Sequence, residues 1–115
     1  MSSHKIYEMS FGKIYDAYQN KVERKDRTAD ELDEVLYWLT GYDAEALREL
    51  AEDGVTMREF FKGNSGLNPD RFLVTGSICG VKIDEIEDSL MKEIRIMDKV
   101  VDELAKGKPI DKIKR

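Results

Sequence analysis

Residues 28–62, TADELDEVLYWLTGYDAEALRELAEDGVTMREFFK, predict a series of helices, because this one stretch contains three helix starts and two helix stops. Two threonines each stand three residues before a glutamate, which is the capping-box spacing. In a capping box, the side-chain oxygen of the cap residue accepts a hydrogen bond from a free backbone N–H. The acid three residues on accepts a hydrogen bond from the backbone N–H of the cap residue. A glycine after an apolar pattern predicts a left-handed helix stop. The starts and stops are Thr28, Gly41, Asp43, Gly54 and Thr56.

The preceding segment predicts a helix from Ser10 to about Lys25. Its apolar side chains recur every three or four residues and so share one helical face. Residues 1–9 are expected to be a flexible lead. The apolar face consists of Phe11, Ile14, Tyr15, Tyr18 and Val22.

After residue 62, the run GNSG at 63–66 predicts a loop within one domain. Asn68 followed by Pro69 predicts the next helix start, because proline at the first helical position loses no hydrogen bond. We expect this helix to contain Gly76 and to end at Gly80. Its packing residues would be Phe72, Leu73 and Ile78.

A last, long helical pattern runs to Lys106, and Asp84 with Glu87 shows a third capping-box spacing. Gly107 stops this helix, and residues 108–115 form a basic tail. The apolar face could pack on the chain's own helices or form a homodimer. That face consists of Ile86, Leu90, Ile94, Met97, Val101 and Leu104, with Ile96 and Val100 beside it.

These patterns predict a single all-α domain over residues 1–115. We expect a compact orthogonal bundle of five or six helices, with the long C-terminal helix packed across the others. A chain of 115 residues with 41% hydrophobic content can form a core without metal or disulfide support.

Charge is unevenly distributed, although the net charge is only −5. Residues 29–62 hold ten acids and three bases, whereas residues 105–115 hold five bases and one acid. Residues 13–27 are also mildly basic, with five bases and three acids. The two basic ends could bind nucleic acid. The tail could instead be a solvated end, touch an acidic partner, or fold back on the acidic middle of its own domain.

The reactive residues predict no catalytic, cofactor or metal site. The lone His4 has no second histidine or nearby cysteine with which to bind zinc. The lone Cys79 excludes an internal disulfide and favours a reducing cytoplasm. No apolar run approaches the roughly 20 residues that span a membrane.

A helix-turn-helix is the most tempting motif. Small and apolar residues from Gly76 to Ile86 have nearly its spacing. The recognition helix would however present Asp84, Glu85, Glu87 and Asp88 to the phosphates. DNA binding relies on lysine and arginine at that position. We therefore do not expect nucleic-acid binding through this segment.

The leading functional hypothesis is a cytoplasmic, non-catalytic interaction or regulatory module. Such a module would bind a protein partner, or form a homodimer, through the C-terminal helix. The alternatives are nucleic-acid binding through the basic ends, and a small-molecule binder or enzyme with a cleft near Trp38 and Tyr42. The tentative binding surface is Trp38, Tyr42 and Cys79.

Nearly the whole chain resembles a small uncharacterised bacterial family, domain of unknown function 2200 (DUF2200). The resemblance implies a compact all-helical domain in a prokaryote and brings no activity, ligand or partner with it. The runs that carry it are SF (10–11), ERK (23–25), WLTGYD (38–43), NP (68–69), TG (75–76), CGV (79–81), IED (86–88) and DKVVDELAKGK (98–108).

One position departs from the family pattern. The family often has proline where this chain has Ser89. Proline there would make Asp88 a helix cap, which implies a break near Asp88 and a separate short turn over residues 83–87. Ser89 relaxes this constraint, so a continuous helix through Asp88 is also compatible with the sequence.

Overall fold

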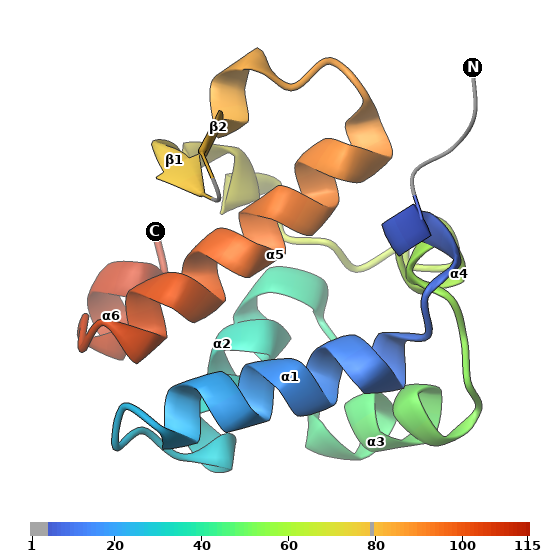
Figure 1. Cartoon of the computed structure of the whole chain (residues 1–115), viewed down its shortest axis with the longest axis horizontal. Coiled ribbons are helices and arrows are strands. Elements are labelled where there is room, and N and C mark those ends of the chain that lie inside the picture. The colour runs from blue at the N-terminus through green and yellow to red at the C-terminus, as the bar shows by residue number, and fades with distance from the viewer. Residues whose placement is uncertain (1–4, 79) are drawn as a thin grey trace.

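The computed structural model describes residues 5–78 and 80–115, which pack around one hydrophobic core. The predicted all-α fold is confirmed, with one small β-hairpin added (Figure 1). In chain order the elements are the 3-10 helix η1 (Lys5–Glu8), α1 (Phe11–Glu23), α2 (Ala29–Thr40), α3 (Ala44–Glu52), α4 (Met57–Lys62), the 3-10 helix η2 (Pro69–Leu73), β1 (Ser77–Ile78), β2 (Val81–Lys82), the 3-10 helix η3 (Ile83–Glu85), α5 (Ser89–Ala105) and α6 (Ile110–Ile113).

The four predicted helix starts at Ser10, Thr28, Asp43 and Thr56 are confirmed. Each of these side chains accepts a hydrogen bond from the backbone N–H three residues on. Both threonines form complete capping boxes with their glutamates. α2 ends at Gly41, which has the left-handed φ of 79° that the sequence predicted.

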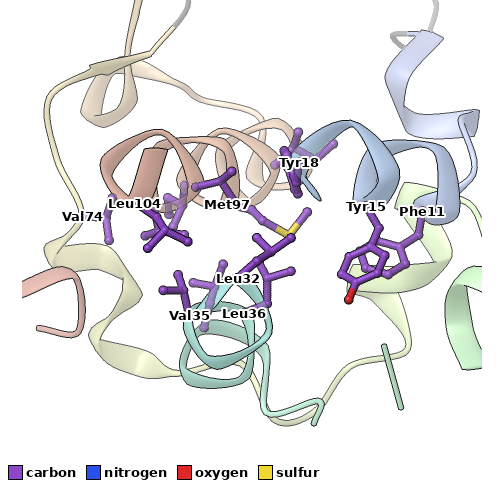
Figure 2. Packing of buried hydrophobic residues seen from close by; sticks show 14 of the residues in the cluster. Phe11, Tyr15, Tyr18, Leu32, Val35, Leu36, Val74, Met97 and Leu104 are labelled. Carbon is purple, nitrogen blue, oxygen red and sulfur yellow. The ribbon is translucent and has the colours of Figure 1, made fainter. Parts of the chain in front are cut away.

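The core lies where α1, α2 and α5 meet. Figure 2 shows Tyr18 of α1, Leu32 and Leu36 of α2, and Met97 of α5 converging on it. Toward α4, the rings of Phe11 and Phe60 stack with their centroids 4.1 Å apart.

α5 lies between two layers of its own chain. The helices α1 and α2 cover one side, and the hairpin and η3 contact it from another, as Figure 1 shows. Lys99 donates to the carbonyl of Ser77 in the hairpin (3.0 Å), on the helix face that also holds Ile96 and Val100. The wide apolar face therefore reflects burial within one chain, because Ile94, Ile96, Met97, Val100, Val101 and Leu104 are all buried.

The helix predicted from Asn68 to Gly80 is wrong. Its first turn is the 3-10 helix η2, and an antiparallel hairpin follows, with Ile78 opposite Val81. Gly76 has a φ of 95°, which no right-handed helix accommodates. The helix-turn-helix reading therefore fails for the described residues of this segment.

The long helix begins at Ser89, so the capping box predicted for Asp84 and Glu87 is also wrong. Residues Ile83–Glu85 form η3 instead. The Asp88 carboxylate accepts from the backbone N–H of Leu90 (2.9 Å) and Met91 (3.1 Å), which makes Asp88 the cap of α5. The break that the family pattern implied is therefore present although this chain has serine after Asp88.

Both ends of the described chain are folded onto the body. Residues 5–8 of the expected flexible lead form η1, in which Tyr7 is buried. The basic tail also folds back: Ile113 is 0% exposed. Arg115 forms a two-pronged ion pair with Glu103 (2.7 and 2.9 Å). This confirms, for the tail, the alternative in which bases contact acids of the same chain.

Candidate functional site

The loop between α4 and η2 is fastened to the end of α2. The last carbonyls of a helix have no partner within the helix, and this loop supplies the donors. The Asn64 amide donates to the carbonyl of Thr40 (2.9 Å). Asn68 donates through its backbone N–H to Leu39 (3.0 Å) and through its side chain to Trp38 (3.1 Å). α2 therefore holds the start of η2 in a fixed place.

Gly41 allows the loop to come this close. A Cβ atom built on Gly41 would lie 2.8 Å from the carbonyl oxygen of Gly66. That is shorter than an ordinary contact with a carbon atom, and backbone cannot rotate out of the way as a side chain can. The residue that stops α2 is thus also the residue that admits the loop.

A partly buried ion pair fixes the other side of η2 to α5. Arg71 Nε lies 2.7 Å from one carboxylate oxygen of Glu93, and its Nη2 lies 2.8 Å from the other. Both side chains are only 14% exposed. This parallel geometry is the strong, orientation-specific form of an arginine–carboxylate contact. η2 is therefore anchored to α2 at its start and to α5 at its middle.

Two consecutive residues of this anchored segment have large apolar side chains that are exposed. Phe72 is 54% exposed and Leu73 is 59% exposed. The prediction that they pack in the core is wrong, because Val74 takes the inward position at this end of the segment. The Arg71 guanidinium lies 4.3 Å from the centre of the Phe72 ring, and Lys92 Nζ lies 5.8 Å from it. These cations hold the ring without covering it.

A hollow of about 310 Å³ opens between α4, the loop before η2, and the start of α5. Phe61, Leu67 and Leu90 give it apolar walls, and Arg58 and Lys62 of α4 supply cations. Small-molecule sites usually measure about 300–1,000 Å³, so this hollow is at the small end of that range. Its size suits one or two side chains better than a large cofactor.

The structure places Trp38 and Tyr42 as supports of this region. Both are partly buried and pack against the core. The Tyr42 ring lies 5.4 Å from that of Phe60, and the Trp38 carbonyl accepts from Asn68. Neither lines the hollow between α4 and α5. The third member of the predicted surface, Cys79, and the lone His4 lie outside the described residues.

Acidic side chains gather elsewhere, around a hollow of about 300 Å³ that Asp30, Asp33 and Asp43 help to line. Asp33 is buried and accepts a hydrogen bond from Tyr15. Burial, and then this contact, raise the pKa of Tyr15 above its ordinary value, so the phenol remains a neutral donor. Within residues 5–78 and 80–115, no cluster of three or more His, Cys, Asp or Glu side chains could hold a metal ion.

The basic ends lie together, but their cations largely face carboxylates of the same chain. Arg27 donates to the carbonyls of Leu104 and Lys108, which brings the two ends side by side. The ion pairs in this region are Arg27–Glu31, Lys21–Asp102, Lys106–Asp102, Lys108–Glu103, Arg115–Glu103 and Lys114–Glu34. Phosphate binding needs free cations, so this pairing reduces the number of cations that the two ends offer to a nucleic acid.

Sequence reasoning missed the residues that form the η2 region. Only Asn68 and Pro69 marked its start, as a helix cap and a first helical residue. The pairing of Arg71 with Glu93 joins residues 22 positions apart. No local spacing shows such a contact, and so the exposure of Phe72 and Leu73 could not be predicted.

Residues 5–115 match the family described as an uncharacterized protein conserved in bacteria (DUF2200). The chain therefore belongs to this family, as its sequence motifs predicted. The fold is also similar to the crystal structure of the uncharacterized protein SP1917, with 44% sequence identity and a TM-score of 0.90. That similarity covers 97% of this chain and 92% of the other. No curated protein matches the chain.

The descriptions of these relatives name no activity. Among the helices of the described residues, none has the length and apolar character needed to cross a membrane.

Proposed function

We propose that this DUF2200 protein is a non-catalytic, cytoplasmic protein-interaction module, and that its binding surface is the η2 face. We define the η2 face as Phe72 and Leu73, the hollow that Glu93, the partner of Arg71, helps to line, and the cations Arg58, Lys62 and Lys92. The single observation that carries the proposal is the exposure of Phe72 and Leu73 on a segment anchored at two points.

Energetics support this reading. Full burial of a leucine or phenylalanine side chain is worth about 1.5–3 kcal/mol. More than half of each side chain is still exposed, so a partner that covered both would gain a large part of this free energy. Single exposed apolar residues are common and need no explanation, but two adjacent ones on a rigid support are a better anchor.

Preorganisation supports it as well. A flexible segment must be ordered when a partner binds, which weakens binding. Here the Asn68 contacts and the Arg71–Glu93 pair order η2 in the free protein. The face of α5 from Ile94 to Leu104 does not offer a comparable surface, because its apolar residues are already buried within the chain itself. A homodimer through α5 is therefore not part of the proposal.

A capture experiment with matched variants tests the proposal. The tagged full-length protein, a Phe72→Ser/Leu73→Ser double variant and a Tyr37→Ser control would each be used to recover partners from a bacterial lysate. Tyr37 is a fair control because it is 56% exposed and lies on α2. We expect the control to retain a partner and the double variant to lose at least tenfold in recovery.

Equal recovery by all three proteins would contradict the proposal, and so would failure of the normal protein to recover any partner. Size-exclusion chromatography with light scattering would show whether a second copy of this chain is the partner. Circular dichroism would verify that the double variant remains folded.

A further inference from the structure

We propose that the partner binds as a short linear segment that inserts an apolar side chain into the hollow between α4 and α5 and sets a carboxylate against Arg58 and Lys62. This inference rests on the proposed function, because it names the class of partner for the same face. It follows from the apolar walls of the hollow, the charges around it, and the pairing of its lining residue Glu93 with Arg71 of η2.

The apolar part of the ligand follows from the walls. Phe61 and Leu90 face the hollow from α4 and α5, and Leu67 contributes from the loop between α4 and η2. All three pack against the core or belong to it, so their positions are fixed. An incoming leucine or phenylalanine side chain would meet apolar surface on several sides.

The charges around the hollow favour a carboxylate in the ligand. Glu93 lines it but is neutralised by its two-pronged contact with Arg71. Lys62 also lines it and has no acidic partner among the ion pairs of the described residues. An incoming carboxylate would therefore meet one unneutralised cation directly.

Arg58 can serve as the second cation. It pairs with Glu8 at 3.0 Å, but the two side chains are 42% and 59% exposed. Such surface pairs contribute at most about 1 kcal/mol, so a ligand carboxylate can take the place of Glu8. The guanidinium also lies 5.2 Å from the centre of the Tyr7 ring, which keeps it at the edge of the hollow.

Two nearby acids, Asp88 and Glu59, do not line the hollow. Asp88 is committed to the cap of α5, where it accepts from two backbone N–H groups. Glu59 is committed to the capping box of α4. Lys92, beside Phe72, adds a further cation on the same face. An apolar side chain flanked by acids therefore complements this surface better than one flanked by neutral or basic residues.

Fluorescence anisotropy with labelled, terminally blocked peptides tests the inference. The probes share two adjacent leucines and differ in the flanking residues, which are aspartates, asparagines or lysines. With the full-length protein we expect saturable binding of the aspartate probe, about tenfold weaker binding of the asparagine probe, and weaker binding still of the lysine probe. Added salt should reduce this preference, because it screens exposed charges.

Two charge-reversal variants test whether the preference for the aspartate probe depends on Lys62. Lys62→Glu should abolish the preference for the aspartate probe, whereas Lys112→Glu should leave it unchanged. Both lysines are exposed, but Lys112 lies on α6. Equal effects of the two variants would overturn the inference, as would equal affinities for the aspartate and asparagine probes or no saturable binding of any probe.

The outcomes also separate this inference from the broader proposal. If the probes fail but lysate capture still depends on Phe72 and Leu73, the interaction module stands and the peptide class is wrong. If light scattering shows a dimer that Lys62→Glu breaks, the occupant is a second copy of the chain, and the inference is again overturned.

Discussion

Replacing Gly41 by alanine should destabilise the protein more than the same replacement at Gly54. Both glycines are left-handed, with φ values of 79° and 71°. Alanine pays about 1–2 kcal/mol for this conformation at either position. A Cβ atom at Gly41 would also lie 2.8 Å from the backbone oxygen of Gly66, whereas one at Gly54 would meet nothing within 4 Å. Such overpacking costs about 1–3 kcal/mol.

The difference between the two variants isolates the contact between α2 and the loop. The cost of placing alanine in the left-handed conformation applies to both variants, and so does the gain from a stiffer unfolded chain. We therefore expect Gly41→Ala to be less stable than Gly54→Ala by about 1–3 kcal/mol, the cost of the close contact. Urea denaturation, with the midpoint and the slope compared, measures this difference. Equal losses at the two positions would refute the close approach.

Hydrogen exchange provides a second readout of the same contact. The Asn68 N–H donates to the Leu39 carbonyl at 3.0 Å, across the gap that alanine would widen. Its exchange should accelerate in Gly41→Ala relative to Gly54→Ala. Unchanged protection in both variants would mean that the loop is held by other contacts.

Three further predictions concern the tail, pH and the exposed pair. Ile113→Ala should cost about 2–5 kcal/mol in urea denaturation, because Ile113 is fully buried; a cost below about 1 kcal/mol would show the tail to be dispensable. Burial alone would raise the pKa values of Glu103 and Asp102. Their cation partners have the larger effect, so the pKa of Glu103 lies below its ordinary 4.5 and that of Asp102 below its ordinary 3.8. Their contribution to stability is therefore present above about pH 4.5 and is lost as the pH falls further. In Glu103→Gln, the free energy of unfolding should fall less steeply as the pH is lowered below about 4.5. An acid dependence equal to that of the normal protein would contradict the pairing. Phe72→Ser and Leu73→Ser should each change stability by at most about 0.5 kcal/mol in thermal unfolding, since both side chains are exposed; a large loss at either position would place it in the core.

The sequence predicted the N-terminal half well because that half is governed by local rules. Thr28 and Thr56 each carry their cap and their acid within one turn, and Gly41 needs only its own conformation to end α2. Capping of this kind depends on residues three or four positions apart, so spacing alone can reveal it.

The segment from Gly76 to Asp88 failed for the opposite reason. β1 and η3 pack on α5, and β2 pairs with β1, so local propensity did not decide their structure. Asp84 and Glu87 have the spacing of a capping box, but the helix begins later. Asp88 is its cap, because its carboxylate accepts hydrogen bonds from two backbone N–H groups. Only the family pattern indicated the break, because proline after Asp88 marks the first turn of a helix.

The candidate site was even less accessible from sequence. Arg71 and Glu93, and the walls Phe61 and Leu90, are brought together from distant parts of the chain. Trp38 was singled out for its aromatic ring, but its carbonyl is what positions the site, through Asn68. Backbone groups of this kind carry no signature in the side-chain pattern.

Photocrosslinking in living cells would show whether a partner binds at the η2 face. A photoreactive amino acid would replace Phe72 in one sample and Tyr37 in another, since these two rings are about equally exposed at 54% and 56%. We predict a discrete crosslinked partner from position 72 and none from position 37. The same products from both positions, or none from position 72, would contradict the assignment of the η2 face as the binding surface.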